Sequence, residues 1–581
     1  MCGIFCVIKK RGNLNTDKCI KTLSRLNHRG PDWSFYKIIN KNVFMGQTVL
    51  SMTGKEKKNT NLNFSRNGNY FILFNGEIYN YSQINKVYLK KKIFGEYSDT
   101  QILVNLFEEK SIADVNKILD GMYAYIVYDK ANNKIFASRD PQGEKILYYY
   151  ESKNEIIFSS EINSIIFYLN KYEIDFDILK SYFLTRHFTL INKTIFKNIK
   201  ILEPGSAIKI NLNSFKIDHN EILNLVNLVN ENEYKSLNKL GEKDLVENLD
   251  FLLKKNIREM IPKKRLFGSI FSGGIDSSLV SKYLSLYSNP LEYIFINHIG
   301  KDYHTRHIKK FSDILGTKIT IKNVNIQEYY DYLKKGLLIN NSPINSHSWV
   351  GQLIISKRIK SLKGKAVFGG EGADELFGGY ETYRQKIENF RNNNSDYTKI
   401  LKYKIFKNNS YCNFFKKHLD KKWLLAKKRY EFLNKDENYR AAMMLMDVTF
   451  QMSSNGLRGA DLMGMAHSVE GRSLFFRRDI LKFALNLPIR HKISLNNKKQ
   501  IKTKILLKKV FLKYYPKSLI LKKQGFAGFP NEMQKYLGNF TKYTVRKFFI
   551  KKKFDKLYKI DRAINWKFIN TELFLKKIIN K

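Results

Sequence analysis

The sequence is short of cysteine, of acidic residues and of long apolar runs, and each shortage argues against a class of protein. Its four cysteines are too few and too unevenly spaced for a disulfide framework or a paired-cysteine metal site: Cys2, Cys6, Cys19 and Cys412. No run of about 18 apolar residues occurs, which argues against a membrane-spanning helix. The first residues, MCGIFCVIKKRG, place their charge after the apolar stretch, the wrong order for a secretory signal. We expect a reducing, cytoplasmic setting without a membrane partner.

Acidic residues are outnumbered, with 53 Asp and Glu against 102 Lys and Arg, which gives a net charge of +49. This balance brings nucleic acid into consideration. The lysines are scattered along the whole chain, however, and we find no zinc-finger spacing or aromatic–basic RNA motif. We therefore favour a solvated basic surface and predict no specific nucleic-acid partner. The 581 residues, 43% apolar and 14% aromatic, suffice for several domains with real cores.

The first two hundred residues read as β-rich, with turn residues between the apolar segments. Buried strands are predicted at 70–74, 123–128 and 156–159. Asn132-Asn133 is a plausible hairpin turn that leads into a further strand at 135–137.

Beyond a polar junction at about 220–239, strands alternate with helices. A helix is predicted near 243–260, followed by strands at 266–271, 293–297 and 365–368, of which the first and third run into glycines. Such alternation indicates a parallel sheet. The final third of the chain carries mostly amphipathic helix patterns.

A glycine-rich loop, SGGIDSS at 272–278, follows the first of these strands and opens a helix. Glycines let backbone N–H groups approach a phosphate closely, and the helix N-terminus adds a favourable dipole. The serine hydroxyls can donate to phosphate oxygens, and Asp276 can bind Mg²⁺. An ordinary capped glycine turn is the alternative. The order Ser-Gly-Gly-x-Asp-Ser between a strand and a helix favours the phosphate loop.

A second glycine-rich segment, FGGEGADELFGGY at 368–380, crowds Glu371, Asp374 and Glu375 together. Like charges this close are costly unless a cation or a basic substrate group lies among them. Two such loops at the carboxyl ends of strands indicate one crevice of an α/β sheet. Asp374 and Glu375 could instead merely favour the first turn of a helix, which would leave Glu371 unexplained.

The third candidate is Cys2. If Met1 is removed, Cys2 carries a free α-amine with a pKa of about 7.7–8.0, which suits it as base to its own thiol. A buried structural cysteine is the alternative. The segment NGEIYN at 75–80 follows a predicted strand and can offer an amide and a glycine N–H as oxyanion donors.

Together these motifs resemble a known family. Cys2, HRGPDWS (28–34), NGEIYN, Ser98-Asp99, RDPQGEKILYY (139–149) and FSSEI (158–162) resemble the class II glutamine amidotransferase domain. SGGIDSS, GGEGADELFGGY and MAHSVEGR (465–472) resemble the ATP-pyrophosphatase synthetase domain. Their order and spacing are similar to those of glutamine-hydrolysing asparagine synthetases over nearly the whole chain.

The resemblance implies a fold and an activity. The implied fold is an α+β, Ntn-hydrolase-like αββα sandwich at 1–215, a linker at 216–240, and an α/β domain with a parallel sheet and helical additions at 241–581. The implied activity converts aspartate, ATP and glutamine to asparagine, AMP, pyrophosphate and glutamate through β-aspartyl-AMP. Ammonia would pass between the domains inside the protein. A homodimer is a further expectation.

For the glutaminase site, the resemblance implies that the Cys2 thiolate attacks the side-chain amide of glutamine. Asn75 and Gly76 would form the oxyanion hole, and Glu77 and Asp99 would hold the substrate's α-amine. Leu50 is a further predicted glutamine-binding residue.

For the synthetase site, the resemblance implies ATP with Mg²⁺ as cofactor. Asp276 and Asp374 would bind the metal, and Glu371 would contact the intermediate and remove a proton from ammonia. Lys504, in TKILLKK (503–509), is chosen over Lys502 to neutralise phosphoryl charge. The predicted nucleotide-binding residues are Phe271, Ser272, Gly273, Gly274, Asp276, Ser277, Ser278, Asn297, Gly369 and Gly370.

Three departures from the family pattern bear on its substrates. Val49 stands where the family has an arginine that binds the α-carboxylate of glutamine, and losing an ion pair worth about 2–5 kcal/mol should weaken glutamine binding. Arg477 replaces an aspartate, and Asn341–Ser348 replaces an acidic stretch, both expected near the acceptor.

Three alternatives therefore remain. A related amidotransferase could amidate another carboxylate, such as a sugar acid or a peptide. A synthetase with a weakened glutaminase could depend mainly on ammonia. A basic binding protein on a decayed enzyme fold is disfavoured by the intact loops at 272–278 and 371–375.

Overall fold

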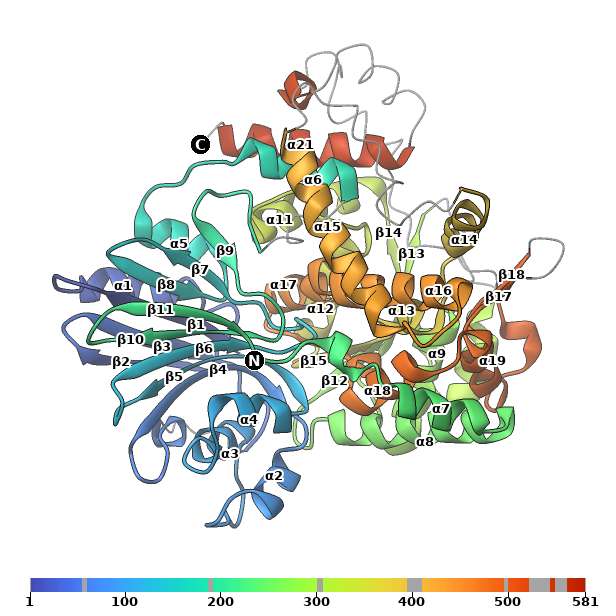
Figure 1. The fold of residues 1–581 in the computed structure, drawn as a ribbon, viewed down its shortest axis with the longest axis horizontal. Helices are drawn as coiled ribbons and strands as arrows, with labels where there is room; N and C mark the ends of the chain where they lie inside the picture. Colours follow the sequence, from blue (N-terminus) through green and yellow to red (C-terminus); the bar gives the residue numbers. More distant parts are fainter. Residues whose placement is uncertain are drawn as a thin grey trace.

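A computed structural model describes the protein at residues 2–54, 60–185, 192–299, 307–393, 410–495, 500–521, 544–548 and 562–579. Two stacked antiparallel sheets form the amino-terminal part, and a parallel sheet surrounded by helices forms the carboxyl-terminal part (Figure 1). Within the described residues, no helix is both long enough and apolar enough to cross a bilayer.

The amino-terminal sheets are both antiparallel. The first has the order β2 (Trp33–Asn40), β3 (Val43–Val49), β1 (Cys2–Lys9), β8 (Glu155–Ser159), β7 (Tyr148–Glu151) and β9 (Ile199–Ile201). The second has the order β11 (Lys216–Glu221), β10 (Ser206–Asn211), β6 (Lys134–Arg139), β5 (Gly121–Asp129) and β4 (Tyr70–Ile78).

Strand β1 illustrates why these sheets are covered on both faces. Its Ile4, Cys6 and Ile8 pack in the core between the two sheets, whereas Phe5 and Val7 pack in the core on the opposite face. Side chains of a strand alternate between faces, so a strand that is apolar at every position needs cover on both. Helices α1 (Thr16–Ser24) and α5 (Ile162–Leu169) cover the first sheet, and α2 (Tyr81–Val87), α3 (Asp99–Leu106) and α4 (Ile112–Ile118) cover the second. The predicted αββα sandwich is confirmed.

The carboxyl-terminal sheet is parallel, with the order β14 (Ile319–Val324), β13 (Tyr293–His298), β12 (Phe267–Ile270), β15 (Ala366–Gly369) and β16 (Glu470–Ser473). The chain begins at the central strand β12, adds two strands on one side and then two on the other. The direction of winding therefore reverses between β12 and β15, where open α/β sheets form their ligand crevice. The two glycine-rich loops follow these two strands.

Helices surround this sheet and reach back to the sandwich (Figure 1). The connecting helices are α8 (Glu242–Met260), α9 (Ile275–Tyr287), α10 (Ile308–Leu315), α11 (Ile326–Asn340) and α12 (Ser348–Ser361). Beyond β15 lie α13 (Ala373–Phe377), α14 (Thr382–Asn393), α15 (Ser410–Arg429), α16 (Lys435–Met446), the π-helix η6 (Asp447–Gly456), α17 (Leu457–Met465), α18 (Arg478–Asn486), α19 (Ile505–Leu512) and α21 (Arg562–Ile579). Helix α21 packs on α6 (Phe176–Thr185), where Lys567 Nζ donates to the Phe183 carbonyl at 2.6 Å.

The strands predicted from the sequence are confirmed, but two strands of the parallel sheet, β14 and β16, were not predicted. The expected boundary at 215 falls inside the hairpin formed by β10 and β11. The segment 216–240, expected as a linker, contains β11, the 3₁₀ helix η3 (Leu225–Leu228) and α7 (Glu231–Lys239). The amino-terminal sheet therefore ends at Glu221.

Candidate functional site

Cys2 opens β1 and pairs with Val49 of β3, with 7% of its surface exposed. Its backbone nitrogen donates to Asn75 Oδ1 at 3.0 Å. Burial raises the pKa of the Cys2 thiol, while hydrogen bonds from the Leu50 backbone and the Gln47 side chain act in the opposite direction. A thiol with a raised pKa is mostly protonated at neutral pH, so its use as a nucleophile requires a base.

Asn75 and Gly76 lie near the end of β4, beside Cys2. Asn75 is fully buried, and its Nδ2 has no hydrogen-bond partner within the described chain. An unpaired buried donor costs about 1–3 kcal/mol, which marks Asn75 as a donor available to a bound molecule. A Cβ on Gly76 would lie 2.1 Å from the Met122 carbonyl oxygen, so the pairing of β4 with β5 requires glycine there.

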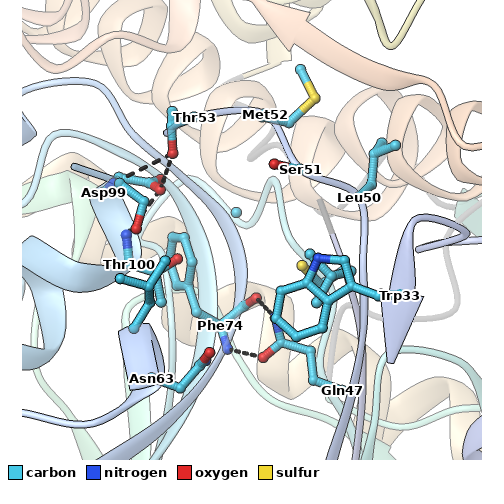
Figure 2. A pocket seen from close by; sticks show the side chains of 15 residues that line it. Trp33, Gln47, Leu50, Ser51, Met52, Thr53, Asn63, Phe74, Asp99 and Thr100 are labelled. Atoms are coloured by element: carbon cyan, nitrogen blue, oxygen red, sulfur yellow. Dashed lines mark hydrogen bonds between the residues drawn. The ribbon is translucent and has the colours of Figure 1, made fainter. Parts of the chain in front are cut away.

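A pocket beside Cys2 brings together the predicted residues Leu50, Gly76 and Asp99. On one side of this pocket, Asp99 is hydrogen-bonded to Thr53 (Figure 2). Trp33 lies on the opposite side of the pocket. The Asp99 carboxylate accepts from Thr53 Oγ1 at 2.7 Å and from the backbone nitrogens of Ile78 at 3.1 Å and Thr100 at 2.9 Å. Burial raises the pKa of Asp99 and these hydrogen bonds lower it. Among the described residues that line the pocket, Asp99 is the one with an acidic side chain.

Glu77 is not brought to that pocket wall. Its carboxylate pairs with the Arg472 guanidinium of β16, which also donates from Nε to Glu470 Oε1 at 2.8 Å. All three side chains are buried, and a buried carboxylate needs a charged partner. Arg472 comes from the carboxyl-terminal sheet, so this ion cluster joins the two parts of the molecule. The placement differs from the predicted contact with a substrate amine.

The loop after β12 forms a hydrogen-bonded turn that leads into α9. Ser277 Oγ accepts from the Ser272 backbone nitrogen at 3.0 Å and lies 2.8 Å from Ser272 Oγ. Gly273 has a φ of 72°, and Gly274 precedes the first residue of α9. Ser278 Oγ is buried without a hydrogen-bond partner among the described residues. These groups leave backbone and hydroxyl donors at a helix N-terminus, the arrangement that binds phosphate.

The loop after β15 packs directly on the first loop. A Cβ on Gly370 would lie 2.9 Å from Asp276 Cβ and 3.1 Å from the Ser277 nitrogen, so the backbones meet without room for a side chain. Glu371 Oε1 accepts from Gln352 Nε2 of α12 at 3.1 Å. Burial raises the pKa of Glu371, and the charge of Asp276 raises it further. The predicted residues Gly369, Gly370 and Glu371 thus lie beside the SGGIDSS loop.

Lys504 joins the carboxylates of both loops. Its Nζ lies 2.5 Å from Asp276 Oδ2 and 2.6 Å from Asp374 Oδ1, with 6% of the residue exposed. Lys504 immediately precedes α19 and has a φ of 51°, a left-handed conformation that costs a non-glycine residue roughly 1–2 kcal/mol. Such local strain is typical of functional sites. One ammonium group within reach of two carboxylates shows that a single cation can contact both.

Two other predicted nucleotide residues lie at the same end of the sheet. Phe271 follows β12, is buried, and meets Phe311 edge to face with ring centroids 5.0 Å apart. Asn297 lies on the neighbouring strand β13, where its Nδ2 donates to Asn323 Oδ1 at 2.8 Å. Its Oδ1 is buried without a partner in the described chain.

Several residues of the site were not singled out from the sequence. Arg29 is fully buried and donates from Nε to the Cys2 carbonyl at 3.3 Å. Its NH2 group donates to Asp461 Oδ2 of α17 at 2.9 Å, and Lys145 Nζ lies 3.5 Å from Asp461 Oδ1. Arg29 lies within the HRGPDWS motif, but Asp461 is 432 residues away in sequence and no local pattern links the two.

The departures at Arg477 and Asn341–Ser348 fall at buried and half-buried positions that make contacts within the protein. Arg477 pairs with Asp120 Oδ2 at 2.6 Å and with Glu259 Oε2 at 2.6 Å, which joins the amino-terminal sandwich to α8. Within Asn341–Ser348, Asn345 is buried and donates to the Ser454 carbonyl at 2.7 Å.

Comparison with known proteins agrees with this arrangement. A family model described as asparagine synthase matches residues 248–573, and one described as a glutamine amidotransferase domain matches residues 1–220. The chain belongs to the asparagine synthase family. The suspected family is thereby confirmed.

Relatives within this family match most of the chain. Asparagine synthetase [glutamine-hydrolyzing] 1 of Bacillus subtilis (strain 168) is 26% identical over 596 residues, covering 93% of this chain and 88% of that protein. A putative asparagine synthetase [glutamine-hydrolyzing] 1 of Methanocaldococcus jannaschii is 25% identical over 533 residues, covering 87% of this chain and 84% of that protein. A solved glutamine phosphoribosylpyrophosphate amidotransferase from B. subtilis matches with a TM-score of 0.30 and 12% identity, over 56% of this chain and 81% of that chain. A likeness that low carries no argument here.

Proposed function

We propose that this member of the asparagine synthase family is a glutamine-dependent asparagine synthetase. It converts aspartate, ATP and glutamine to asparagine, AMP, pyrophosphate and glutamate. The observation that carries the proposal is the meeting of the loops at 272–278 and 369–375 with Lys504 at the reversal point of the parallel sheet. Phosphate-binding donors, a buried carboxylate and a buried ammonium group there suit the activation of a carboxylate by ATP.

Glutamine hydrolysis is assigned to the pocket of Cys2. The Cys2 sulfur attacks the side-chain amide carbon of glutamine, ammonia leaves with the proton of the thiol, and water then hydrolyses the thioester to glutamate. The α-amine of Cys2, once Met1 is removed, is the base, and Asn75 holds it through the 3.0 Å contact. The unpaired Nδ2 of Asn75 and the backbone of Gly76 stabilise the oxyanion, while Asp99 binds the substrate's α-ammonium group.

Carboxylate activation is assigned to the paired loops. Ser272–Ser278 would hold the phosphates of ATP, with Phe271, Asn297, Gly369 and Gly370 around the nucleotide. A β-carboxylate oxygen of aspartate attacks the α-phosphorus, and pyrophosphate leaves. Lys504 neutralises charge on the phosphoryl oxygens. Glu371 removes a proton from the ammonia that attacks the acyl carbon, and AMP leaves.

The two carboxylates near Lys504 fit a magnesium ion. Asp276 and Asp374 offer hard oxygen ligands close enough together to contact one cation. Among the described residues, no group of three or more His, Cys, Asp or Glu residues is positioned as a metal site, so nucleotide phosphates would complete the coordination. When bound, Mg²⁺ supplies charge neutralisation of the departing pyrophosphate.

A cavity lies on the route that ammonia would take between the two sites. Glu371 and Gln352 line one part of it, and Arg472, Gly471 and Ser473 of β16 line another. Arg472 contacts Glu77, the residue after Gly76. The route proposed for ammonia thus runs from Gly76 past Arg472 to Glu371.

The proposal is tested by incubating the purified full chain with aspartate, Mg-ATP and either glutamine or ammonia. We expect asparagine, AMP and pyrophosphate in equal amounts with either nitrogen source. Absence of all three products would refute the proposal, whereas an acyl-adenylate formed only with another carboxylate would support the related-amidotransferase alternative.

Cys2→Ala separates the two sites. We expect it to abolish glutamine-driven synthesis and to retain ammonia-driven synthesis, because it removes the nucleophile and leaves the nucleotide loops intact. Cys6→Ala is the matched control, since Cys6 lies four residues along the same strand and in the same core. It should retain both reactions. Loss of both reactions in Cys2→Ala, with both retained in Cys6→Ala, would contradict the assigned division of labour.

A further inference from the structure

The charge distribution in the pocket of Cys2 is one-sided. Of the described residues that line it, Asp99 is acidic and none is lysine or arginine. The wall on the other side from Asp99 contains Trp33 (Figure 2). Trp33 pairs with Val49 in the sheet. Val49 is 9% exposed and lines the pocket with Leu50. The described residues of this wall offer no ion pair to a carboxylate.

Among the described residues, two cations reach the loop that forms this wall, where they contact its backbone, the Ser51 hydroxyl or the supporting Asp32. Arg265 donates from Nε to the Ser51 carbonyl at 3.0 Å and from NH2 to the Gly54 carbonyl at 3.3 Å. Lys365 Nζ pairs at 2.8 Å with Asp32 Oδ2, which also accepts from the Ser51 nitrogen at 2.8 Å. Neither Arg265 nor Lys365 is among the described residues that line the pocket. Arg265 and Lys365 therefore hold the loop in place and do not line the pocket.

We propose that the pocket recognises its amide donor through the α-ammonium group and the side-chain amide, and does not require the donor's α-carboxylate. The inference rests on the proposed glutaminase function and specifies its substrate class: L-glutamine and derivatives of glutamine whose α-carboxyl group is neutral. Asp99 favours a donor with a positive α-ammonium group. It also repels a nearby carboxylate, and no cation among the described lining residues offsets that repulsion.

The chemistry at the reacting amide is the same for both kinds of donor. Cys2 Sγ forms a bond to the amide carbon, the carbon–nitrogen bond breaks, ammonia leaves, and water hydrolyses the thioester. L-Glutamine α-N-methylamide is a suitable neutral-carboxyl donor, because only its side-chain amide can release ammonia. Its α-amide would release methylamine, which is measured separately.

The test measures kcat/KM for ammonia release from L-glutamine and from its α-N-methylamide. We expect the kcat/KM values of the wild-type protein for the two donors to lie within about threefold of each other. Only small differences in size and polarity then distinguish the donors, because no ion pair to the α-carboxylate contributes to binding. Val49→Arg adds a cation to the wall and should shift the ratio toward L-glutamine by about thirtyfold or more. Val49→Met, of similar length and without charge, should keep the wild-type ratio.

The outcomes separate this inference from the proposed function. A wild-type preference for L-glutamine of thirtyfold or more over the methylamide, on the scale of a buried charge pair of about 2–5 kcal/mol, would overturn the inference and leave the glutaminase function standing. No ammonia release from either donor, with ammonia-driven synthesis intact, would overturn both and support a synthetase that depends on ammonia. If Val49→Arg fails to fold, the wild-type ratio alone decides.

Discussion

Lys504 shows how a single buried charge serves the synthetase site. It lies in a left-handed backbone conformation, with its ammonium group between Asp276 and Asp374. Burial lowers the pKa of the Lys504 ammonium group, but the charges of Asp276 and Asp374 raise it by more, so Lys504 stays protonated at neutral pH. The charged amine contacts both candidate metal ligands, Asp276 and Asp374. In the proposed reaction it stabilises the negative charge that develops on the phosphoryl oxygens.

Lys504→Met retains most of the side-chain length and removes the charge. We expect synthesis from either nitrogen source to fall by about 10²–10³-fold, the usual effect of losing one donor to transition-state charge. Glutamine hydrolysis should persist, because Cys2 lies in the other part of the molecule. Lys502→Met is the matched control, since Lys502 is exposed and lies two residues earlier. Steady-state assays of both reactions check this, and equal losses in the two variants would contradict the role of Lys504.

Glu371 connects function to stability through its pKa. Its folded-state pKa is raised by burial, so the stability it contributes is present at low pH and lost as the pH rises through that raised pKa. Glu371→Gln removes this loss and keeps an oxygen to accept from Gln352. We expect a higher free energy of unfolding than wild type above the raised pKa, together with loss of asparagine synthesis.

Urea unfolding at several values between about pH 4 and pH 8 measures the effect of Glu371→Gln, since ordinary carboxyl groups titrate near the lower limit. Glu381→Gln, at an exposed position just after the same glycine-rich segment, should leave the pH dependence unchanged. A Glu371→Gln variant that is less stable than wild type at neutral pH would show that the carboxylate stabilises the fold.

Glu77 shows the limit of prediction at the residue scale. The NGEIYN motif suggested a residue of the glutamine pocket, but the Glu77 carboxylate pairs with Arg472, 395 residues away in sequence. The choice between a substrate amine and a protein guanidinium depends on which cation the fold brings near. Asn75, by contrast, has its oxygen and its unpaired nitrogen next to Cys2, as its place in the same motif suggested.

At the scale of elements, the sequence predicted strands whose residues are apolar and contiguous. Strands β13 and β15 have such cores, β12 (FGSI) is flanked by Leu266 and Phe271, and each of the three was predicted. Strand β14, ITIKNV, alternates buried and exposed positions at the sheet edge, and β16, EGRS, is four residues of mainly polar character. The charges of β16 are buried only because Glu77 and Glu470 surround Arg472, and that pairing exists only in the folded protein.

Helix α17 connects the two sites through Asp461. The Asp461 carboxylate holds Arg29, which donates to the Cys2 carbonyl, and Ala460 and Gly464 of the same helix line the cavity beside Glu371. Asp461→Asn leaves the Arg29 charge with less compensation in a fully buried position. We expect the free energy of unfolding to fall by about 3–5 kcal/mol, and the kcat of glutamine hydrolysis to fall more than that of ammonia-driven synthesis.

Denaturant unfolding and the two kinetic assays measure these effects of Asp461→Asn. Glu231→Gln is the control, because its pair with Lys235 is exposed and should contribute under about 1 kcal/mol. An unfolding free energy unchanged in Asp461→Asn would show that Arg29 does not depend on Asp461 for its charge balance.

At the scale of the whole molecule, the domain order and both loop systems could be predicted from the sequence, because each motif is local. The contact between the domains could not, since it is made by residues far apart in the chain, such as Arg477 with Asp120. The sequence did not indicate a site for the net charge of +49. In the structure, the buried arginines Arg29, Arg472 and Arg477 form ion pairs between the two domains.

Arg472 is the residue through which the coupling of the two reactions can be tested. It pairs with Glu77 and Glu470 and lines the cavity that Glu371 also lines. Arg472→Lys keeps the charge but cannot reproduce the forked geometry of these contacts. We expect the ratio of glutamate formed to asparagine formed to rise above the wild-type value, as ammonia escapes before it is used. An unchanged ratio with normal folding would place the ammonia route elsewhere.

The most direct measurement follows the oxygen atoms of the activated carboxylate. Aspartate labelled with ¹⁸O in its β-carboxylate is incubated with Mg-ATP and ammonia, and the AMP is analysed by mass spectrometry. If the loops at 272–278 and 369–375 form an acyl-adenylate, each AMP carries one ¹⁸O atom and the pyrophosphate carries none. Unlabelled AMP, or label in pyrophosphate or inorganic phosphate, would contradict the proposed activation of aspartate at this site.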